Sequence, residues 1–152
     1  MRKLFYSFLL LLTIPAFAAD PNPGKQNISK DILSQVDSLK QVFAQYGYTV
    51  VREAAMDMES EYEIPVILPL NEGTMYHIIF IADPTSRIQE VRMFDYDEKQ
   101  VFYQKNMIQA DGNIISYSYQ PQFSEWHMIR PLQVNKVRKN CSGYVMLLKK
   151  VK

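Results

Sequence analysis

The sequence predicts a mainly β protein, an antiparallel β-sandwich or jelly roll of about eight strands with one N-terminal α-helix. Only one segment, residues 29–46, has apolar side chains at helical spacing. The rest of the chain divides into short apolar or alternating runs separated by turn residues. Connections of a few residues are too short for parallel crossovers, and so many short strands need two layers. The alternative is an α+β fold, with the helix packed across one curved antiparallel sheet as in cystatin-like folds.

The N-terminal residues are expected to precede the folded domain. A basic start, an apolar stretch and the cleavage signal Ala16-Phe17-Ala18 are typical of a signal peptide over residues 1–18. Two prolines and a glycine predict a flexible leader over residues 19–27. One β-sandwich domain would then span residues 28–152. The protein would be exported, to the periplasm or to the cell surface or extracellular space.

The charge of the chain excludes one class of partner. The 152 residues include 17 basic and 16 acidic side chains, a formal net charge of +1. Loss of the signal peptide would remove Arg2 and Lys3 and leave one net negative charge. A near-neutral chain lacks the basic surface of a nucleic-acid binder, so no nucleic-acid partner is expected. After residue 18 no apolar run approaches the roughly 20 residues of a membrane-spanning helix.

The helix is predicted over residues 29–46. Ser29 is a suitable N-cap, Asp31 is favourable in the first turn, and Gly47 can adopt the left-handed conformation that ends a helix. The apolar positions follow one another at steps of three or four and form one stripe: Ile28, Ile32, Val36, Leu39, Phe43 and Tyr46. This stripe must pack against another element, and the rest of the chain offers a sheet.

The strands are predicted from alternation and from turn residues. They are expected at residues 48–58, 62–68, 75–82, 88–95, 100–103, 115–119, 126–132 and 143–151. Pro65 in the second run indicates an edge strand. The run 75–82 is apolar on both parities, which predicts burial on both faces. Ile115, Tyr117 and Tyr119 alternate with serines, which predicts one buried and one wet face.

Two hairpins are expected in the second half of the chain. One joins residues 88–95 to 100–103 around Asp97-Glu98-Lys99. The other is predicted at Asp111-Gly112-Asn113, because glycine and short polar residues accept a positive φ.

Motifs for catalysis and cofactor binding are missing from the sequence. His77 and His127 are the two histidines, and they form neither a close pair nor an HExxH motif. Nucleotide-binding glycine loops and the GxSxG motif of hydrolases are also missing. We therefore expect a protein that is not an enzyme, with no catalytic residue, no cofactor-binding residue, no metal ligand and no cofactor.

Cys141 is the only cysteine, so an intramolecular disulfide is excluded. One interpretation is a small buried residue. The other is an intermolecular disulfide or a reactive thiol, which leaves the oligomeric state open. A dyad of Cys141 with a histidine, with Asn140 beside it, lacks a following helix that would lower the pKa of the thiol.

Acidic side chains offer two candidate surfaces. Five share one parity and would form a stripe on an uninterrupted strand: Glu53, Asp57, Glu59, Glu61 and Glu63. The stripe is interpreted as a solvated edge that discourages aggregation, or else as a surface for calcium or a basic partner. Asp95 and Asp97 could supply oxygen ligands to Ca²⁺, but the full EF-hand loop is missing and turn chemistry is the simpler interpretation.

Aromatic side chains are the other candidate binding residues, because tyrosine and tryptophan combine apolar area with a polar tip that can stack on sugars or anchor a peptide. Tyr117 and Tyr119 are assigned to the core, and Trp126 to either the core or the surface. Five residues form this group: Tyr96, Tyr103, Tyr117, Tyr119 and Trp126.

The order of features over residues 66–151 resembles the bacterial pre-peptidase C-terminal domain, a small jelly-roll β-sandwich of secreted proteins. The matching segments are Val66–Leu70 with Gly73-Thr74-Met75-Tyr76, Val91–Asp97 with its acidic turn, Tyr119-Gln120-Pro121 through Trp126, and Gly143–Leu148. The chain departs from the family at Glu125, at Trp126 and in a hairpin after Asp97 without the usual glycine. The resemblance implies a non-catalytic domain that assists secretion or binds a large substrate, with calcium bound in some relatives.

Three functional hypotheses follow. The first is an exported, non-enzymatic β-sandwich that binds a protein or polysaccharide at the cell envelope. The second is a structural or assembly component that docks a partner through helix 29–46. The third is an enzyme that uses surface carboxylates such as Asp95 and Asp97.

Overall fold

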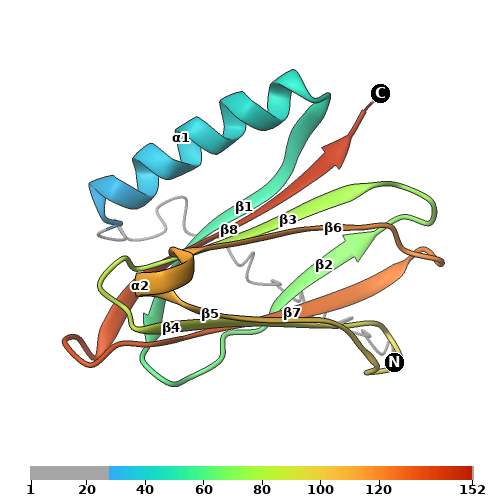
Figure 1. Cartoon of the computed structure of the whole chain (residues 1–152). Helices are drawn as coiled ribbons and strands as arrows, with labels where there is room; N and C mark the ends of the chain where they lie inside the picture. The colour runs from blue at the N-terminus through green and yellow to red at the C-terminus, as the bar shows by residue number, and fades with distance from the viewer. Residues whose placement is uncertain (1–27, 152) are drawn as a thin grey trace, which may run out of the picture.

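The computed structural model describes residues 28–151 and shows two four-stranded antiparallel sheets packed face to face, with helix α1 as a third layer (Figure 1). The predicted fold class is confirmed. The elements are α1 (Lys30–Gln45), β1 (Tyr48–Glu59), β2 (Val66–Leu70), β3 (Tyr76–Ala82), β4 (Ile88–Phe94), β5 (Gln100–Met107), α2 (Ile108–Asp111), β6 (Ile114–Tyr119), β7 (Glu125–Val134) and β8 (Asn140–Lys150). Within these residues, neither helix combines the length and the apolar character that a membrane crossing requires.

The strand pairing is that of a jelly roll. Sheet A has the order β1-β8-β3-β6 and sheet B the order β2-β7-β4-β5. First pairs with last, second with seventh, third with sixth and fourth with fifth, every pair antiparallel. The chain is therefore one long nested hairpin rolled into two sheets.

Helix α1 packs on the outer face of sheet A, as its stripe requires. Ser29 Oγ accepts a hydrogen bond from Ile32 N at 3.2 Å, and Gly47 has a φ of 79° just after the helix. Ile32 and Val36 are fully buried against sheet A. The prediction for Tyr46 is wrong: this side chain is 67% exposed, because it lies at the C-cap beyond the last helical turn over the sheet.

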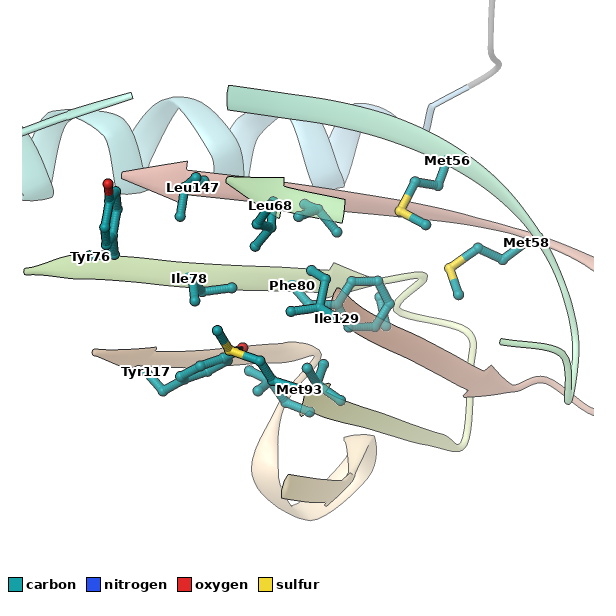
Figure 2. Packing of buried hydrophobic residues seen from close by; sticks show 14 of the residues in the cluster. Met56, Met58, Leu68, Tyr76, Ile78, Phe80, Met93, Tyr117, Ile129 and Leu147 are labelled. Carbon is teal, nitrogen blue, oxygen red and sulfur yellow. Dashed lines mark hydrogen bonds between the residues drawn. The ribbon is translucent and has the colours of Figure 1, made fainter. Parts of the chain in front are cut away.

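Strand β3 is apolar on both parities because it lies between two cores. Ile79 and Ile81 face α1, whereas Ile78 and Phe80 face sheet B. Figure 2 shows the core between the sheets, where Met56 of β1, Leu68 of β2, Met93 of β4 and Ile129 of β7 meet the side chains of β3. The α+β alternative accounts for the helix and sheet A but not for sheet B.

Two predictions about connections are corrected. Residues 62–65 lie in the turn before β2, which begins at Val66, although β2 is an edge strand as Pro65 indicates. Residues 111–113 do not form a hairpin turn, because β5 belongs to sheet B and β6 to sheet A. The short helix α2 and Gly112, with a φ of 82°, carry the chain from one sheet to the other.

Candidate ligand-binding surface

Three turns meet at one end of the sandwich, which we call the loop end: residues 71–75, 95–99 and 120–124. Hydrogen bonds join the first turn to the third. Gly73 N donates to Pro121 O at 3.0 Å, Gln120 Nε2 donates to Gly73 O at 2.8 Å, and Glu72 N donates to Ser124 Oγ at 2.9 Å. The backbone at the loop end is therefore fixed by its own contacts.

A hollow of about 270 Å³ opens at the loop end between the second and third turns. Phe123 at its rim is 66% exposed. The hollow is lined by three carboxylates, one lysine, two amides, two aromatic rings and one aliphatic side chain: Asp95, Asp97, Glu125, Lys99, Gln120, Gln122, Tyr119, Phe123 and Val101. Two shallower depressions adjoin it, since one shares Gln120 and Gln122 and the other shares Glu125 and includes Trp126.

His127 is buried behind the hollow and contacts two of its lining residues, Tyr119 and Glu125. Its buried Nε2 is hydrogen-bonded to the Tyr119 hydroxyl at 3.0 Å and lies 3.7 Å from Glu125 Oε1. Burial raises the pKa of Tyr119, and the negative charges of Asp95 and Glu125 raise it further. Tyr119 therefore stays a neutral phenol that presents a hydrogen-bonding group at the hollow.

The sequence-based assignment of aromatic residues is confirmed for Tyr117 and only in part for Tyr119. Tyr117 is buried and stacks on Phe102, with ring centroids 3.5 Å apart. Tyr119 is only half-buried, because it lies at the end of β6 where the two sheets open into the hollow. The open question of Trp126 is decided in favour of the surface, where it is 56% exposed.

The outer face of sheet B continues from the loop end. Helix α1 covers the outer face of sheet A, but no element among residues 28–151 covers sheet B on its outer side (Figure 1). Because Leu68, Met93, Phe102 and Ile129 point into the core, their strand neighbours point outward. The outward side chains include Trp126, Ile67, Pro69, Met128, Arg130, Phe94, Arg92 and Tyr103.

Asp95 and Asp97 line the hollow instead of lying on a convex turn. Asp95 Oδ1 accepts a hydrogen bond from Lys99 N at 2.8 Å, so this carboxylate also closes the β4–β5 hairpin, which confirms turn chemistry. Within the described residues, no group of three or more His, Cys, Asp and Glu side chains is placed to hold a metal ion. The geometry thus gives the calcium interpretation no support.

The predicted acidic stripe is not continuous. Strand β1 has a register shift between Val50 and Arg52 and ends at Glu59, so Glu61 and Glu63 lie in the following turn. Four of the five acids have cationic partners: Glu53 with Lys40, Glu59 with Lys139, Glu61 with Lys136 and Glu63 with Arg92. Because β1 is an edge of sheet A, the interpretation as a charged edge strand fits best.

Cys141 is a buried residue, 2% exposed, and burial raises the pKa of its thiol. Its Sγ lies against the Arg138 carbonyl oxygen at 3.9 Å. This geometry favours the interpretation as a small core residue over a reactive thiol.

His77 lies on the other face of sheet A, beneath the Phe43 ring and between the hydroxyls of Ser116 and Ser118.

The sequence pattern does not indicate Phe123, Gln120 or Gln122 as candidate binding residues. One sequence feature could have indicated them: the mostly polar segment 120–124, which is typical of an exposed turn, contains one large apolar residue, Phe123. Phenylalanine in a polar turn has no core to enter, so its ring stays exposed.

No protein-family model matches the chain, and no curated protein matches it. The fold is similar to a structure described as "CBM4 structure and function", with 19% identity and a TM-score of 0.43 over 68% of this chain and 78% of that one. It is also similar to a "Glycosylation Associate Protein (Gap123) complex from Streptococcus agalactiae", with 11% identity and a TM-score of 0.39 over 71% of this chain. The match spans 41% of that second chain. At these TM-scores neither similarity bears on function.

Proposed function

We propose that the protein is an exported, non-enzymatic β-sandwich that binds a polysaccharide at the cell envelope through its loop end. One observation carries the proposal: Phe123 and Trp126 are exposed beside hollows lined with amide and carboxylate groups. A sugar has an apolar face of C–H groups and a rim of hydroxyls. Aromatic rings suit the face, while Gln120, Gln122 and the acids suit the rim.

The hypothesis that a partner docks on helix α1 is not favoured, because the apolar surface of the helix is already covered in this fold. The stripe that would bind a partner is packed on sheet A, with Ile32 and Val36 fully buried. The pre-peptidase C-terminal resemblance stays a proposal, supported by the jelly-roll pairing and by the segments over residues 66–151 that match the family's order of features.

Replacing the exposed aromatic residues tests polysaccharide binding. We expect Phe123→Ala and Trp126→Ala each to weaken the affinity for a bound envelope polysaccharide by about tenfold, because each removes a stacking surface. Isothermal titration against envelope glycans and envelope proteins measures the affinity. Tyr62→Ala is the matched control, since Tyr62 is 64% exposed in the β1–β2 turn and lines none of these hollows.

Equal loss in the Tyr62 control, or binding of proteins alone, would contradict the proposal. New reducing ends in the polysaccharide, lost in Asp97→Asn, would favour the enzyme hypothesis instead. Melting curves of each variant separate lost binding from lost folding.

Export is tested by the mass of the mature chain. We expect cleavage after Ala18, so that the protein recovered from the periplasm or the medium begins at Ala19. An Ala16→Asp, Ala18→Asp double variant should remain uncleaved, because small residues are needed at both positions. Recovery of the full-length chain from the cytoplasm of cells carrying the unaltered sequence would refute export.

A further inference from the structure

The outer face of sheet B places two arginines side by side. The register sets Arg92 of β4 directly opposite Arg130 of β7. Like charges at directly opposed positions destabilise an antiparallel pair. Natural sheets tolerate such a pair when other charges neutralise it or when function requires it.

Only one of the two arginines is neutralised. Arg92 lies 3.4 Å from Glu63 and 3.5 Å from Glu90, and Glu90 also pairs with Lys105. Arg130 instead lies over the Phe94 ring, with its guanidinium carbon 4.8 Å from the ring centroid. Among residues 28–151 no carboxylate reaches ion-pair distance of Arg130. The aromatic contact holds the guanidinium in place but leaves its charge available.

Aromatic side chains extend from this cation in both directions. Phe94 is opposite Met128, two residues from Trp126, and Tyr103 is opposite Arg92, two residues from Phe94. With strands about 4.8 Å apart and a rise of about 3.4 Å per residue, each step of this row is about 8 Å. The row therefore crosses the sheet diagonally over about 16 Å, long enough for an oligosaccharide.

We propose that this face binds a polysaccharide that carries carboxylate groups, such as one containing uronic acids. Charge complementarity selects this ligand: Arg130 pairs with a sugar carboxylate through its planar fork of donors, while Trp126 and Tyr103, which is 50% exposed, stack on sugar faces. The inference rests on the proposed function, because both sites share Trp126, and it names the class of ligand. The chain of sugars runs from the loop end across sheet B.

Polygalacturonate and its fully methyl-esterified form test the inference with one backbone in charged and neutral forms. We expect the purified protein to bind the acid form at least about tenfold more tightly than the ester, and added salt to weaken only the acid form. Arg130→Gln should reduce binding of the acid form to that of the ester. Arg130→Lys, which keeps the charge but loses the fork, should fall between them.

Arg87→Gln is the charge-matched control, because Arg87 is exposed in the β3–β4 turn away from sheet B's outer face. Equal loss in this control, equal affinity for the ester, or equal binding of polyglutamate would overturn the inference, as would failure to bind polygalacturonate. If Phe123→Ala abolishes binding of neutral glycans while Arg130→Gln changes nothing, the proposed function stands and this inference fails. If Arg130→Gln and Trp126→Ala weaken binding while Phe123→Ala has no effect, the outer face of sheet B binds the polysaccharide and the loop-end hollow does not. Melting temperatures must match in all variants.

Discussion

Glu98 adopts a left-handed backbone conformation at the β4–β5 hairpin, with a φ of 61°. Its N–H donates to the Asp95 carbonyl oxygen at 3.1 Å, so the turn geometry is imposed by the hairpin. The side chain has to tolerate a conformation that costs a non-glycine residue about 1–2 kcal/mol.

We expect Glu98→Gly to raise the free energy of unfolding by about 0.5–1 kcal/mol. Relief of the left-handed strain exceeds the backbone entropy that glycine adds to the unfolded chain. Urea unfolding measures the change. Asp97→Gly is the control and should lower stability, because Asp97 has no positive φ for glycine to relieve. A drop in stability for Glu98→Gly would contradict the strain argument.

At the level of single residues, the sequence shows the chemical type of each side chain but not which side chains surround it. Trp126 was a candidate from its type alone, whereas Arg130 had no signal at all. The role proposed for Arg130 depends on the opposing Arg92 and on the Phe94 ring beneath it, which both come from strand β4. Strand register places residues that are far apart in the chain next to each other, and the local sequence around a residue does not reveal that register.

At the scale of elements, the last turns of α1 rest on a cluster of rings over sheet A. Phe43 of α1 lies over His77 of β3, with centroids 4.3 Å apart, and Tyr48 of β1 closes the group. Both His77 ring nitrogens meet serine hydroxyls of β6. Burial lowers the pKa of His77 below its usual range. The folded protein therefore favours the neutral imidazole.

Acidic pH should loosen this contact. Between the lowered pKa of His77 in the folded state and about 6.5 in the unfolded state, the unfolded chain binds more protons, so stability falls as pH drops through that window. The contribution is fully present above about pH 6.5. Hydrogen exchange of the α1 amides at several pH values measures the effect. His77→Gln keeps hydrogen-bonding groups without a charge and should remove the slope. An unchanged slope would assign it to other groups.

Helix α1 was the most predictable element, because its signals are local: a cap at Ser29, a stripe at helical spacing and a glycine at the end. Strands were predictable as segments, with errors at their ends. Residues 62–65 alternate like a strand, yet β2 starts only at Val66, because the chain must first turn from sheet A into sheet B. Alternation of apolar and polar residues shows only that one side of a segment is apolar, and a turn segment that packs one side against the core has the same pattern.

At the scale of the whole molecule, the decisive feature is the nesting of strand pairs. Because of this nesting, residues 88–107 form a hairpin within sheet B, whereas Asp111-Gly112-Asn113 connects sheet B to sheet A. It also brings residues 71–75 and 120–124 together, far apart in sequence, to build the loop end. A turn signal at glycine reports a local φ and says nothing of which sheet receives the next strand.

The amino-acid pattern alone indicates that the chain is mainly β with one amphipathic helix, that Ile79 and Ile81 belong to a strand buried on both faces, and that no recognised catalytic motif is present. Those properties follow from local spacing and composition. The folded arrangement is what makes α1 cover one sheet and leave the other open, and what puts Trp126 and Arg130 on the same outer face of sheet B. Surfaces of this kind combine side chains that long-range strand pairing brings together. That pairing is fixed by burial of the whole core rather than by any single segment.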